Sequence, residues 1–335
     1  MPLCHYCGQP VWGDYVTALG ETWHRDHFLC AGCGKPLSGG KFQVAQGKAY
    51  HPACYLAFQA PRCTCCGQPI AGQYTESEGK AYHPECFREH VVPRCIYCQR
   101  PLLGKYMVDA WGDKYCPEHE TQYPRCSCCS RLVPPRQQTR GWEDYGIVRC
   151  AVCRATAIEV VEQAQPLFQQ CKQWISRQGF TFNKLPLRLE LRERGILLNM
   201  LGDRAINHPL GVTLSSTMQY GQQRSSRIDG VAVLQGMPAT LFAGVVLHEL
   251  GHVWLTVHGI EHLPPWAEEG FCELLSYRYY SDLNTPEALV RASSLEKGSD
   301  PIYGDGFRAV RVLSDRLGFA HLVEVLLTTK RLPAA

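Results

Sequence analysis

The strongest constraint on the fold is a repeated pairing of cysteines in the first half of the chain. Of the 19 cysteines in 335 residues, 17 lie before residue 155, mostly as C-x2-C pairs. Each pair is followed after 16 to 20 residues by a second pair of Cys or His, and the unit recurs about every 30 residues. Cys and His at such spacings bind tetrahedral Zn²⁺. The first 155 residues are therefore predicted to form small zinc modules, held by metal instead of one large hydrophobic core.

Five sets of four ligands account for 15 of these cysteines and five histidines. A zinc site with four protein ligands is closed, so all five ions are predicted to be structural. The CGQP and CGKP signatures predict small hairpins and no helices between the pairs. The four remaining cysteines, Cys65, Cys128, Cys171 and Cys272, are expected to be buried small side chains. The predicted ligands, set by set, are Cys4, Cys7, His24 and His27; Cys30, Cys33, His51 and Cys54; Cys63, Cys66, His83 and Cys86; Cys95, Cys98, Cys116 and His119; and Cys126, Cys129, Cys150 and Cys153.

The first two sets resemble a LIM domain, because only Phe28 and Leu29 separate them. His27 and His51 stand where LIM domains more commonly have Cys, and both are competent zinc ligands. Eight residues, 87–94, separate the third and fourth sets, which resemble a degenerate LIM domain. The fifth set resembles a single zinc ribbon.

A different motif dominates the second half, where His248, Glu249 and His252 form the sequence HELGH. On a helix the two histidines share one face and can hold a single Zn²⁺. Glu249 is placed to take the proton of a water molecule that the metal activates. Residues 238–247 are apolar, as expected for a buried core helix. A catalytic zinc needs a third protein ligand and an open fourth position.

A second helical pattern, WAEEGF, supplies the candidates for the third ligand. Glu269 follows His252 by 17 residues, which suits two antiparallel helices joined by a loop over 258–265. The arrangement resembles the gluzincin clan of metallopeptidases, in which the Glu of an EG pair on the next helix binds zinc; this resemblance implies Glu269. Glu268 and Glu273 remain alternatives. Glu273 lies at i+4 from Glu269 and could instead orient a histidine.

Helical spacing predicts helices at 156–179, through HELGH and from 266 to 280, with a final pair at 306–317 and 319–329 divided by Gly318. Strands are predicted at 185–192, 211–214 and 228–234. As in zincin-like enzymes, the strand before HELGH is expected to be the sheet edge that borders the cleft, where an extended peptide can pair. The whole is an α+β protein: a string of zinc-bound β-hairpin modules, then a zincin-like metallopeptidase domain with a mixed sheet. The expected boundaries are 1–58 for the LIM domain, 59–122 for the LIM-like double module, 123–155 for the ribbon and 156–335 for the peptidase.

The two halves together resemble the DA-one (DA1) family of LIM-containing, ubiquitin-activated zinc metallopeptidases known from plant organ-size control. The resemblance rests on the LIM pair at 4–54, LHELGHVWL, WAEEGFCELLSY and the YGDGFRA stretch at 303–309. It implies limited endoproteolysis of protein substrates, with ubiquitin as a possible partner. The plant members carry ubiquitin-interacting helices ahead of the LIM domain, and this sequence shows no such segment before Cys4.

Composition excludes several other classes of function. Residues 1–155 hold 17 Lys and Arg against 13 Asp and Glu, or +4, and the five zinc sites contribute −5 in sum. The region is thus near −1, whereas a phosphate-binding surface should be clearly basic, so no nucleic-acid partner is expected. No apolar run approaches a membrane span and the N-terminus is no signal peptide, so no membrane partner is expected either. Zinc-binding thiols indicate a reducing, cytoplasmic location.

The predicted function is zinc-dependent peptide hydrolysis with one catalytic and five structural zinc ions. The oxyanion formed during hydrolysis needs a further donor, for which Tyr303, His262 and Tyr277 are candidates. Asp305 is expected to cap the helix at 306. The alternative is a LIM-type interaction scaffold whose peptidase fold is inactive or secondary. The intact HELGH and EEG motifs disfavour it, since a retired site would tolerate loss of Glu249.

Overall fold

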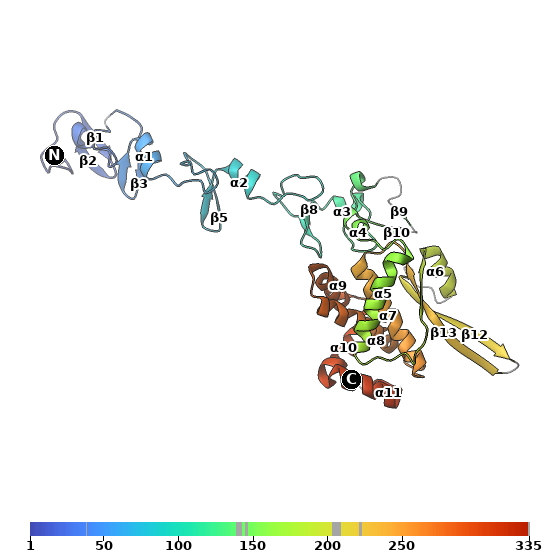
Figure 1. Ribbon diagram of the computed structural model, residues 1–335. Coiled ribbons are helices and arrows are strands. Elements are labelled where there is room, and N and C mark those ends of the chain that lie inside the picture. The colour runs from blue at the N-terminus through green and yellow to red at the C-terminus, as the bar shows by residue number, and fades with distance from the viewer. Residues whose placement is uncertain (38, 139–142, 145–146, 203–208, 221–222, 334–335) are drawn as a thin grey trace. The chain divides into compact units, whose positions relative to one another are not determined.

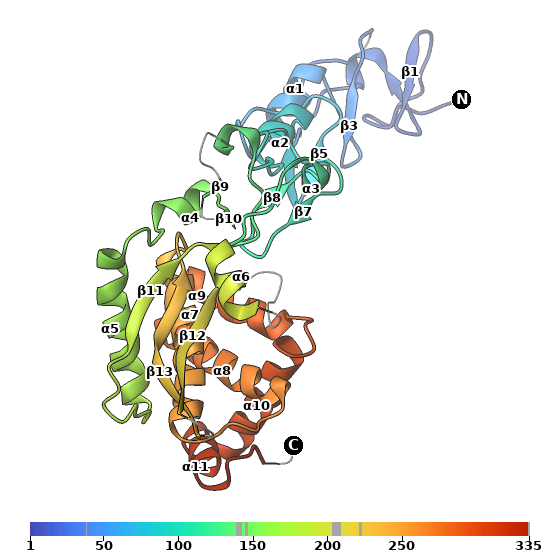
Figure 2. The same cartoon turned by 90° about the vertical axis from the view of Figure 1, so that its right-hand side faces the viewer.

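The computed structural model describes residues 1–37, 39–138, 143–144, 147–202, 209–220 and 223–333, and Figures 1 and 2 show two views of it. The chain folds as two compact units. The first comprises Met1–Met107 and Lys114–Cys116. The second comprises Val108–Asp113 and Pro117–Ala335.

Short antiparallel hairpins recur between the ligand pairs, as predicted. They are β1–β2 (Tyr15–Ala18, Glu21–His24), β3–β4 (Gln43–Ala45, Lys48–Tyr50), β5–β6 (Thr75–Ser77, Lys80–Tyr82), β7–β8 (Met107–Val108, Lys114–Tyr115) and β9–β10 (Glu143–Asp144, Ile147–Val148). Between the ligand pairs of the first four sets the described residues form no helix, as predicted, whereas the fifth set has one 3-10 turn there. Short helices follow several hairpins, namely η1 (Arg25–His27), α1 (Pro52–Phe58), α2 (Pro84–His90), α3 (His119–Gln122) and α4 (Ala151–Ala155), with η2 (Pro135–Gln137) in the ribbon. In α1 and α2 a proline that follows the histidine ligand occupies the first turn, where a missing N–H costs nothing.

Each C-x2-C pair lies in a tight turn, in which the N–H of the residue after the pair donates to the carbonyl of the first cysteine. The residue after the pair has a positive φ: +71° at Gly8, +71° at Gly34 and +72° at Gly67. Glycine is the residue that adopts this conformation without steric cost, which explains the repeated CG dipeptide. Backbone N–H groups also bond the sulfurs, as from His24 to Cys4 Sγ (3.4 Å) and from His51 to Cys30 Sγ (3.3 Å).

Few apolar side chains are buried in these modules. In the first LIM pair the buried cluster consists of Ala18, Phe28, Cys30, Leu37, Ala49 and Tyr50. Such a small core cannot offset the conformational entropy of the ordered chain, so the metal must supply much of the folding free energy.

The zinc ribbon belongs to the second unit and shares its hydrophobic core. Val133 and Ile147 of the ribbon are at most 1% exposed and join the cluster that contains Phe168 and Phe242. Residues 108–113 also belong to this unit: Trp111 Nε1 donates to the Cys129 carbonyl (2.8 Å), and the Arg131 guanidinium lies 3.9 Å from the Trp111 ring centroid.

The rest of this unit is built on the mixed sheet that the sequence predicts. The strand order is β11-β13-β12, with β11 (Arg188–Arg192) parallel and β12 (Gly211–Tyr220) antiparallel to β13 (Gln223–Leu234). The prediction that the strand before HELGH is the sheet edge was wrong. That strand is β13, which is central, and its residues Val231–Leu234 are at most 1% exposed, as the continuous apolar run VAVL indicates for a strand with neighbours on both sides. The edge strand on the other side is β12.

Helices pack around this sheet, as Figure 2 shows. The predicted helices are present as α5 (Val161–Arg177), α7 (Ala239–Val257), α8 (Pro265–Leu283), α10 (Gly304–Leu317) and α11 (Phe319–Thr329), and α5 continues through Pro166. Two more, α6 (Arg194–Leu201) and α9 (Pro286–Lys297), were not predicted. Helix α7 carries HELGH and contacts α5, α8, β12 and β13.

Helix α7 is also long and apolar enough to cross a membrane by length and composition, contrary to the sequence-based expectation. However, 67% of its apolar window is buried inside the protein, which is the property of a core helix. Of the four spare cysteines, Cys128, Cys171 and Cys272 are buried as expected, whereas Cys65 is exposed.

Candidate metal centres and active site

All five predicted structural ligand sets come together in the structure. Within each set the ligand atoms lie within 4.8 Å of one another. With Zn–S near 2.3 Å and Zn–N near 2.0–2.1 Å, a tetrahedral site places S and N about 3.5 Å apart and two S atoms about 3.8 Å apart. Cys7 Sγ and His24 Nδ1 are 3.5 Å apart, Cys33 Sγ and His51 Nδ1 3.4 Å, and Cys98 Sγ and Cys116 Sγ 3.7 Å. The donor sets therefore fit zinc.

A separate cluster of histidines and glutamates forms where α7 and α8 pack together. Glycines allow the two helices to approach closely. A Cβ at Gly251, inside HELGH, would lie 2.8 Å from Cys272 Sγ, and one at Gly244 would lie 1.8 Å from the Tyr280 hydroxyl. A larger residue at either position would push α8 away, so the glycines bring the carboxylates of α8 to the histidines of α7.

Three potential ligand atoms converge in this cluster. His248 Nε2 lies 3.2 Å from His252 Nε2 and 3.1 Å from Glu269 Oε2, and His252 Nε2 lies 3.5 Å from the same carboxylate oxygen. Nitrogen and oxygen ligands about 2.0–2.1 Å from a tetrahedral zinc would lie about 3.3 Å apart. The three atoms can therefore hold one metal ion.

The other two carboxylates contact the far nitrogens of the same imidazoles. His252 Nδ1 donates to Glu268 Oε1 (2.9 Å), and His248 Nδ1 lies 3.7 Å from Glu273 Oε1. A carboxylate at Nδ1 keeps the proton on that nitrogen, so the lone pair of Nε2 points to the metal side. Glu268 thus occupies an orienting position, Glu273 lies too far from His248 Nδ1 for a hydrogen bond, and Glu269 occupies the ligand position.

Burial and ion pairing shift the pKa values of the cluster. Burial alone would lower the pKa of His248, but the hydrogen bond to Glu269 and the charge of Glu273 outweigh it and leave the pKa raised. For Glu269 the same pairing works in reverse: burial favours the neutral acid, yet His248 and His252 hold its pKa below the ordinary value. Burial raises the pKa of Glu273, which lies deeper and has no such close partner.

Glu249 faces β12. The side chain is largely buried, with 6% of the residue exposed, and Thr213 Oγ1 donates to its Oε2 (2.9 Å). Gly211 packs against the same side chain, since a Cβ there would lie 2.7 Å from Glu249 Oε1. Sequence reasoning missed both β12 residues, because a Gly and a Thr in a strand carry no signal of a partner on a later helix.

Tyr303 reaches the cluster from the start of α10. Its ring centroid lies 6.4 Å from that of His248, and burial raises its pKa, so the hydroxyl keeps its proton and can donate a hydrogen bond. The other two donor candidates lie elsewhere: the Tyr277 hydroxyl donates to Glu296 Oε1 (3.0 Å), and His262 is exposed in the loop after α7.

Glycines also explain the WAEEG and YGDG sequences around this tyrosine. A Cβ at Gly270 would lie 2.4 Å from the Gly306 backbone, and a Cβ at Gly306 would lie 2.2 Å from the Trp266 carbonyl. Helices α8 and α10 therefore cross at backbone contact, which sets Tyr303 beside His248. The expected capping role of Asp305 was wrong. Asp300 Oδ1 accepts from the backbone N–H of Tyr303 (2.9 Å) at this helix start, and Asp305 pairs with Arg308 within α10.

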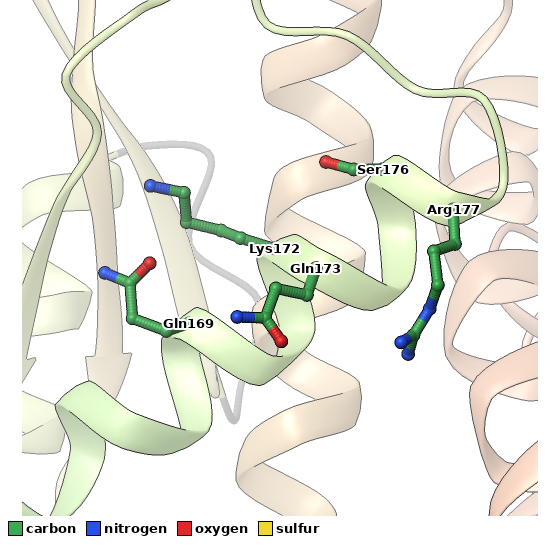
Figure 3. Close-up of a pocket in the computed structure, with 5 residues that line it drawn as sticks. All are labelled: Gln169, Lys172, Gln173, Ser176 and Arg177. Atoms are coloured by element: carbon green, nitrogen blue, oxygen red, sulfur yellow. The ribbon is translucent and has the colours of Figure 1, made fainter.

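A shallow hollow of about 490 Å³ on α5 is separate from this cluster. Figure 3 shows its lining side chains, Gln169, Lys172, Gln173, Ser176 and Arg177, which are polar and all come from one helix. All of these lining residues belong to α5, so the hollow is the solvated face of a single helix.

Both halves of the chain are similar to known protein families. The LIM domain family matches residues 4–59 and 63–123, so the third and fourth ligand sets also form a LIM domain, where a degenerate one was expected. The DA1-like family, described as Protein DA1, matches residues 203–294. Protein DA1 of Arabidopsis thaliana is 26% identical over 99% of this chain and 68% of its own length, and Protein DA1-related 2 of the same plant is 26% identical over 99% and 70%. LIM domain-containing protein HDR3 of Oryza sativa subsp. japonica is 25% identical over 82% of this chain and 55% of its own length.

Proposed function

We propose that this chain, which belongs to the DA1 family of LIM-domain proteins, is a zinc-dependent endopeptidase that cleaves protein substrates. The observation that carries the proposal is the convergence of His248 Nε2, His252 Nε2 and Glu269 Oε2 within 3.5 Å, with the buried carboxylate of Glu249 alongside. Two imidazoles and one carboxylate are the ligands of a catalytic zinc that keeps one position open.

The residues of the chain have separate roles in this mechanism. When bound, zinc supplies a Lewis acid that polarises the scissile carbonyl and acidifies water. Glu249 accepts the proton of the attacking water on its carboxylate and returns it to the leaving amine. Tyr303 donates its O–H toward the oxyanion that develops on the former carbonyl. Glu268 holds the His252 imidazole in the orientation that binds metal.

The edge strand β12 offers a place for an extended peptide. Among the described strands, β12 pairs with β13 on one side only. Its residues Gly211 and Thr213 contact Glu249, so a peptide paired along the outer edge of β12 would pass close to the proposed base. The proposed substrates are therefore protein segments in extended conformation.

Metal content tests the assignment of ligands. Elemental analysis should find about six zinc ions per chain, one more than the five structural sets require. Glu269→Ala should lose one zinc and keep the rest. Glu268→Ala, the matched control one residue away, should keep all of them but bind the zinc of the proposed catalytic site more weakly. Loss of zinc only from the Glu268 variant would move the ligand by one residue.

Activity tests the enzyme against the scaffold alternative. Glu249→Gln should keep its metal and its fold but lose turnover by several orders of magnitude, because the water is no longer deprotonated. The assay compares cleavage of cell-extract proteins by the two metal-replete forms. Equal cleavage patterns, or none from either form, would favour a LIM-type scaffold with an inactive or secondary peptidase fold.

The LIM domains are proposed to bind proteins, with ubiquitin or a ubiquitinated protein as the first candidate, in a reducing, cytoplasmic setting. Closed metal sites cannot catalyse, and the near-neutral charge of the modules does not suit nucleic acid. A titration of the 335-residue chain with ubiquitin should show binding and a change in cleavage rate. If ubiquitin neither binds nor changes the cleavage rate at high micromolar concentration, it is excluded as a partner, and the peptidase proposal still stands.

A further inference from the structure

We infer that Thr213 on β12 is a positioning residue for the base Glu249, and that Gly211 leaves the space in which its carboxylate lies. The inference rests on the proposed function. It concerns the first residues of the edge strand, which no sequence motif of the site includes.

The hydrogen bond from Thr213 is the first observation. Its Oγ1 donates to Glu249 Oε2 at 2.9 Å and lies 3.3 Å from the Glu249 backbone carbonyl. A hydroxyl has one proton, so the shorter contact, to the carboxylate, is taken as the hydrogen bond, and the 3.3 Å contact shows that the threonine lies against this turn of α7. The carboxylate of a residue only 6% exposed needs such a partner, because burying it without one is costly.

The space beside Gly211 is the second observation. A Cβ at this position would lie 2.7 Å from Glu249 Oε1, 2.9 Å from Glu249 Cγ and 2.9 Å from Val245 Cγ1. The φ of Gly211 does not lie in the left-handed region, so backbone conformation does not demand glycine here. The glycine is required by space alone, and the carboxylate fills the place of the missing side chain.

Together the two residues restrict Glu249 at both oxygens. Its three side-chain torsions would otherwise allow several rotamers, of which few place the carboxylate against a water at the Nε2 side of the histidines. Helix α7 determines where the side chain begins, and β12 determines where it ends. Since β12 is also the strand along which a peptide is proposed to pair, substrate register and base position depend on the same residues.

The expected effect is therefore on turnover more than on binding. Thr213→Val keeps the β-branched shape and removes the hydroxyl, and kcat should fall about 10- to 100-fold with KM and zinc content nearly unchanged. Thr213→Ser, which restores a hydroxyl, should recover kcat to within about threefold of the original protein. Thr328→Val on α11, where the hydroxyl donates only to backbone carbonyls, is the matched control and should leave kcat unchanged.

A double-mutant cycle shows whether Thr213 acts through Glu249. The shorter Glu249→Asp side chain does not reach the hydroxyl, so adding Thr213→Val to it should change kcat by less than about twofold. An undiminished 10- to 100-fold loss in that background would overturn the inference, as would a Thr213→Val protein with normal kcat.

Crystal structures of the unsubstituted chain and of its Thr213→Val variant give a readout that needs no activity. The inference expects the Glu249 carboxylate to turn away from β12 in the variant; a carboxylate that stays in place overturns it. If the chain cleaves no protein but the Glu249 carboxylate moves in the variant, the proposed enzymatic function is contradicted, whereas the positioning of Glu249 by Thr213 is supported.

Discussion

The first LIM domain and the zinc ribbon contain the same kind of metal site in very different surroundings. Around the LIM ligands lies a core of few residues, such as Phe28, Leu37 and Tyr50. The ribbon ligands lie in the large core of the second unit, next to Val133 and Ile147. The comparison teaches that one ligand pattern can serve two ends. In the LIM domain the metal substitutes for a large hydrophobic core. In the ribbon the metal stabilises a module that packs on the large hydrophobic core of the second unit.

Hydrogen bonds reinforce this attachment. The Arg149 guanidinium, 3% exposed, donates to Glu159 and to the Gly236 carbonyl (3.1 Å), in the turn between β13 and α7. Arg291 of α9 donates to the Cys128 carbonyl (3.1 Å) and pairs with Glu287, which accepts from Thr240 in the first turn of α7 (3.0 Å). The ribbon is thereby connected to the beginning of the helix that carries HELGH. These contacts run through α9 and the β13–α7 turn.

The largest effect should come from breaking the ribbon site. Cys150→Ser removes a ligand that is 3% exposed, and the second unit should lose a large share of the roughly 10–16 kcal/mol that a structural zinc can contribute. We expect poor expression or a strongly lowered Tm for the whole second unit, with loss of the proposed peptidase activity. Calorimetry together with hydrogen exchange would measure it. Unchanged exchange in α7 would contradict the close connection of ribbon and core.

The matched change in the first LIM domain should remain local. Cys30→Ser should unfold the LIM pair, because little else holds it, and should leave the melting transition of the second unit where it was. Hydrogen exchange resolved by residue gives the measurement. Spread of deprotection from residues 1–58 into α7 or α8 would show that the two regions do not differ as described.

A smaller effect is expected where packing alone holds the second unit. Gly270→Ala places a Cβ against the Gly306 backbone, and we expect a loss of about 1–3 kcal/mol together with displacement of Tyr303. Gly195→Ala in α6, whose Cβ would meet no atom within 4 Å, is the control and should be neutral or stabilising by up to about 1 kcal/mol. Urea unfolding of both variants decides the matter. Equal stabilities would mean that α8 and α10 do not need the close contact.

The smallest effect concerns the hydrogen bonds between ribbon and helices. Arg291→Met keeps the bulk of the side chain and removes the bond to the Cys128 carbonyl, which should cost about 1–2 kcal/mol. Arg177→Met on the exposed face of α5 should change stability by less than about 0.5 kcal/mol. The shift of the urea midpoint separates the two. If Arg291→Met loses no more unfolding free energy than Arg177→Met, the ribbon is held by its hydrophobic contacts and not by this hydrogen bond.

Local spacing was enough to identify much of this protein. The five ligand sets follow from C-x2-C pairs repeated at a regular spacing, and HELGH follows from helical periodicity, because both patterns are recorded in local spacing along the chain. Helix α9 was missed although Thr285, whose hydroxyl accepts from the Ala288 N–H (3.3 Å), precedes Pro286 in a recognisable helix start.

Contacts between distant segments were decided by the tertiary structure alone. The sequence left Glu268, Glu269 and Glu273 as rival ligands, since all three lie within about one turn of α8, and the close packing of α7 on α8 put Glu269 at the Nε2 atoms. The order of the strands also depended on the tertiary structure, because a pattern of apolar residues indicates which side chains are buried but not which strand lies next to them. Thr213 and Gly211 became part of the site only because β12 lies against α7, a position that depends on every layer of the second unit at once.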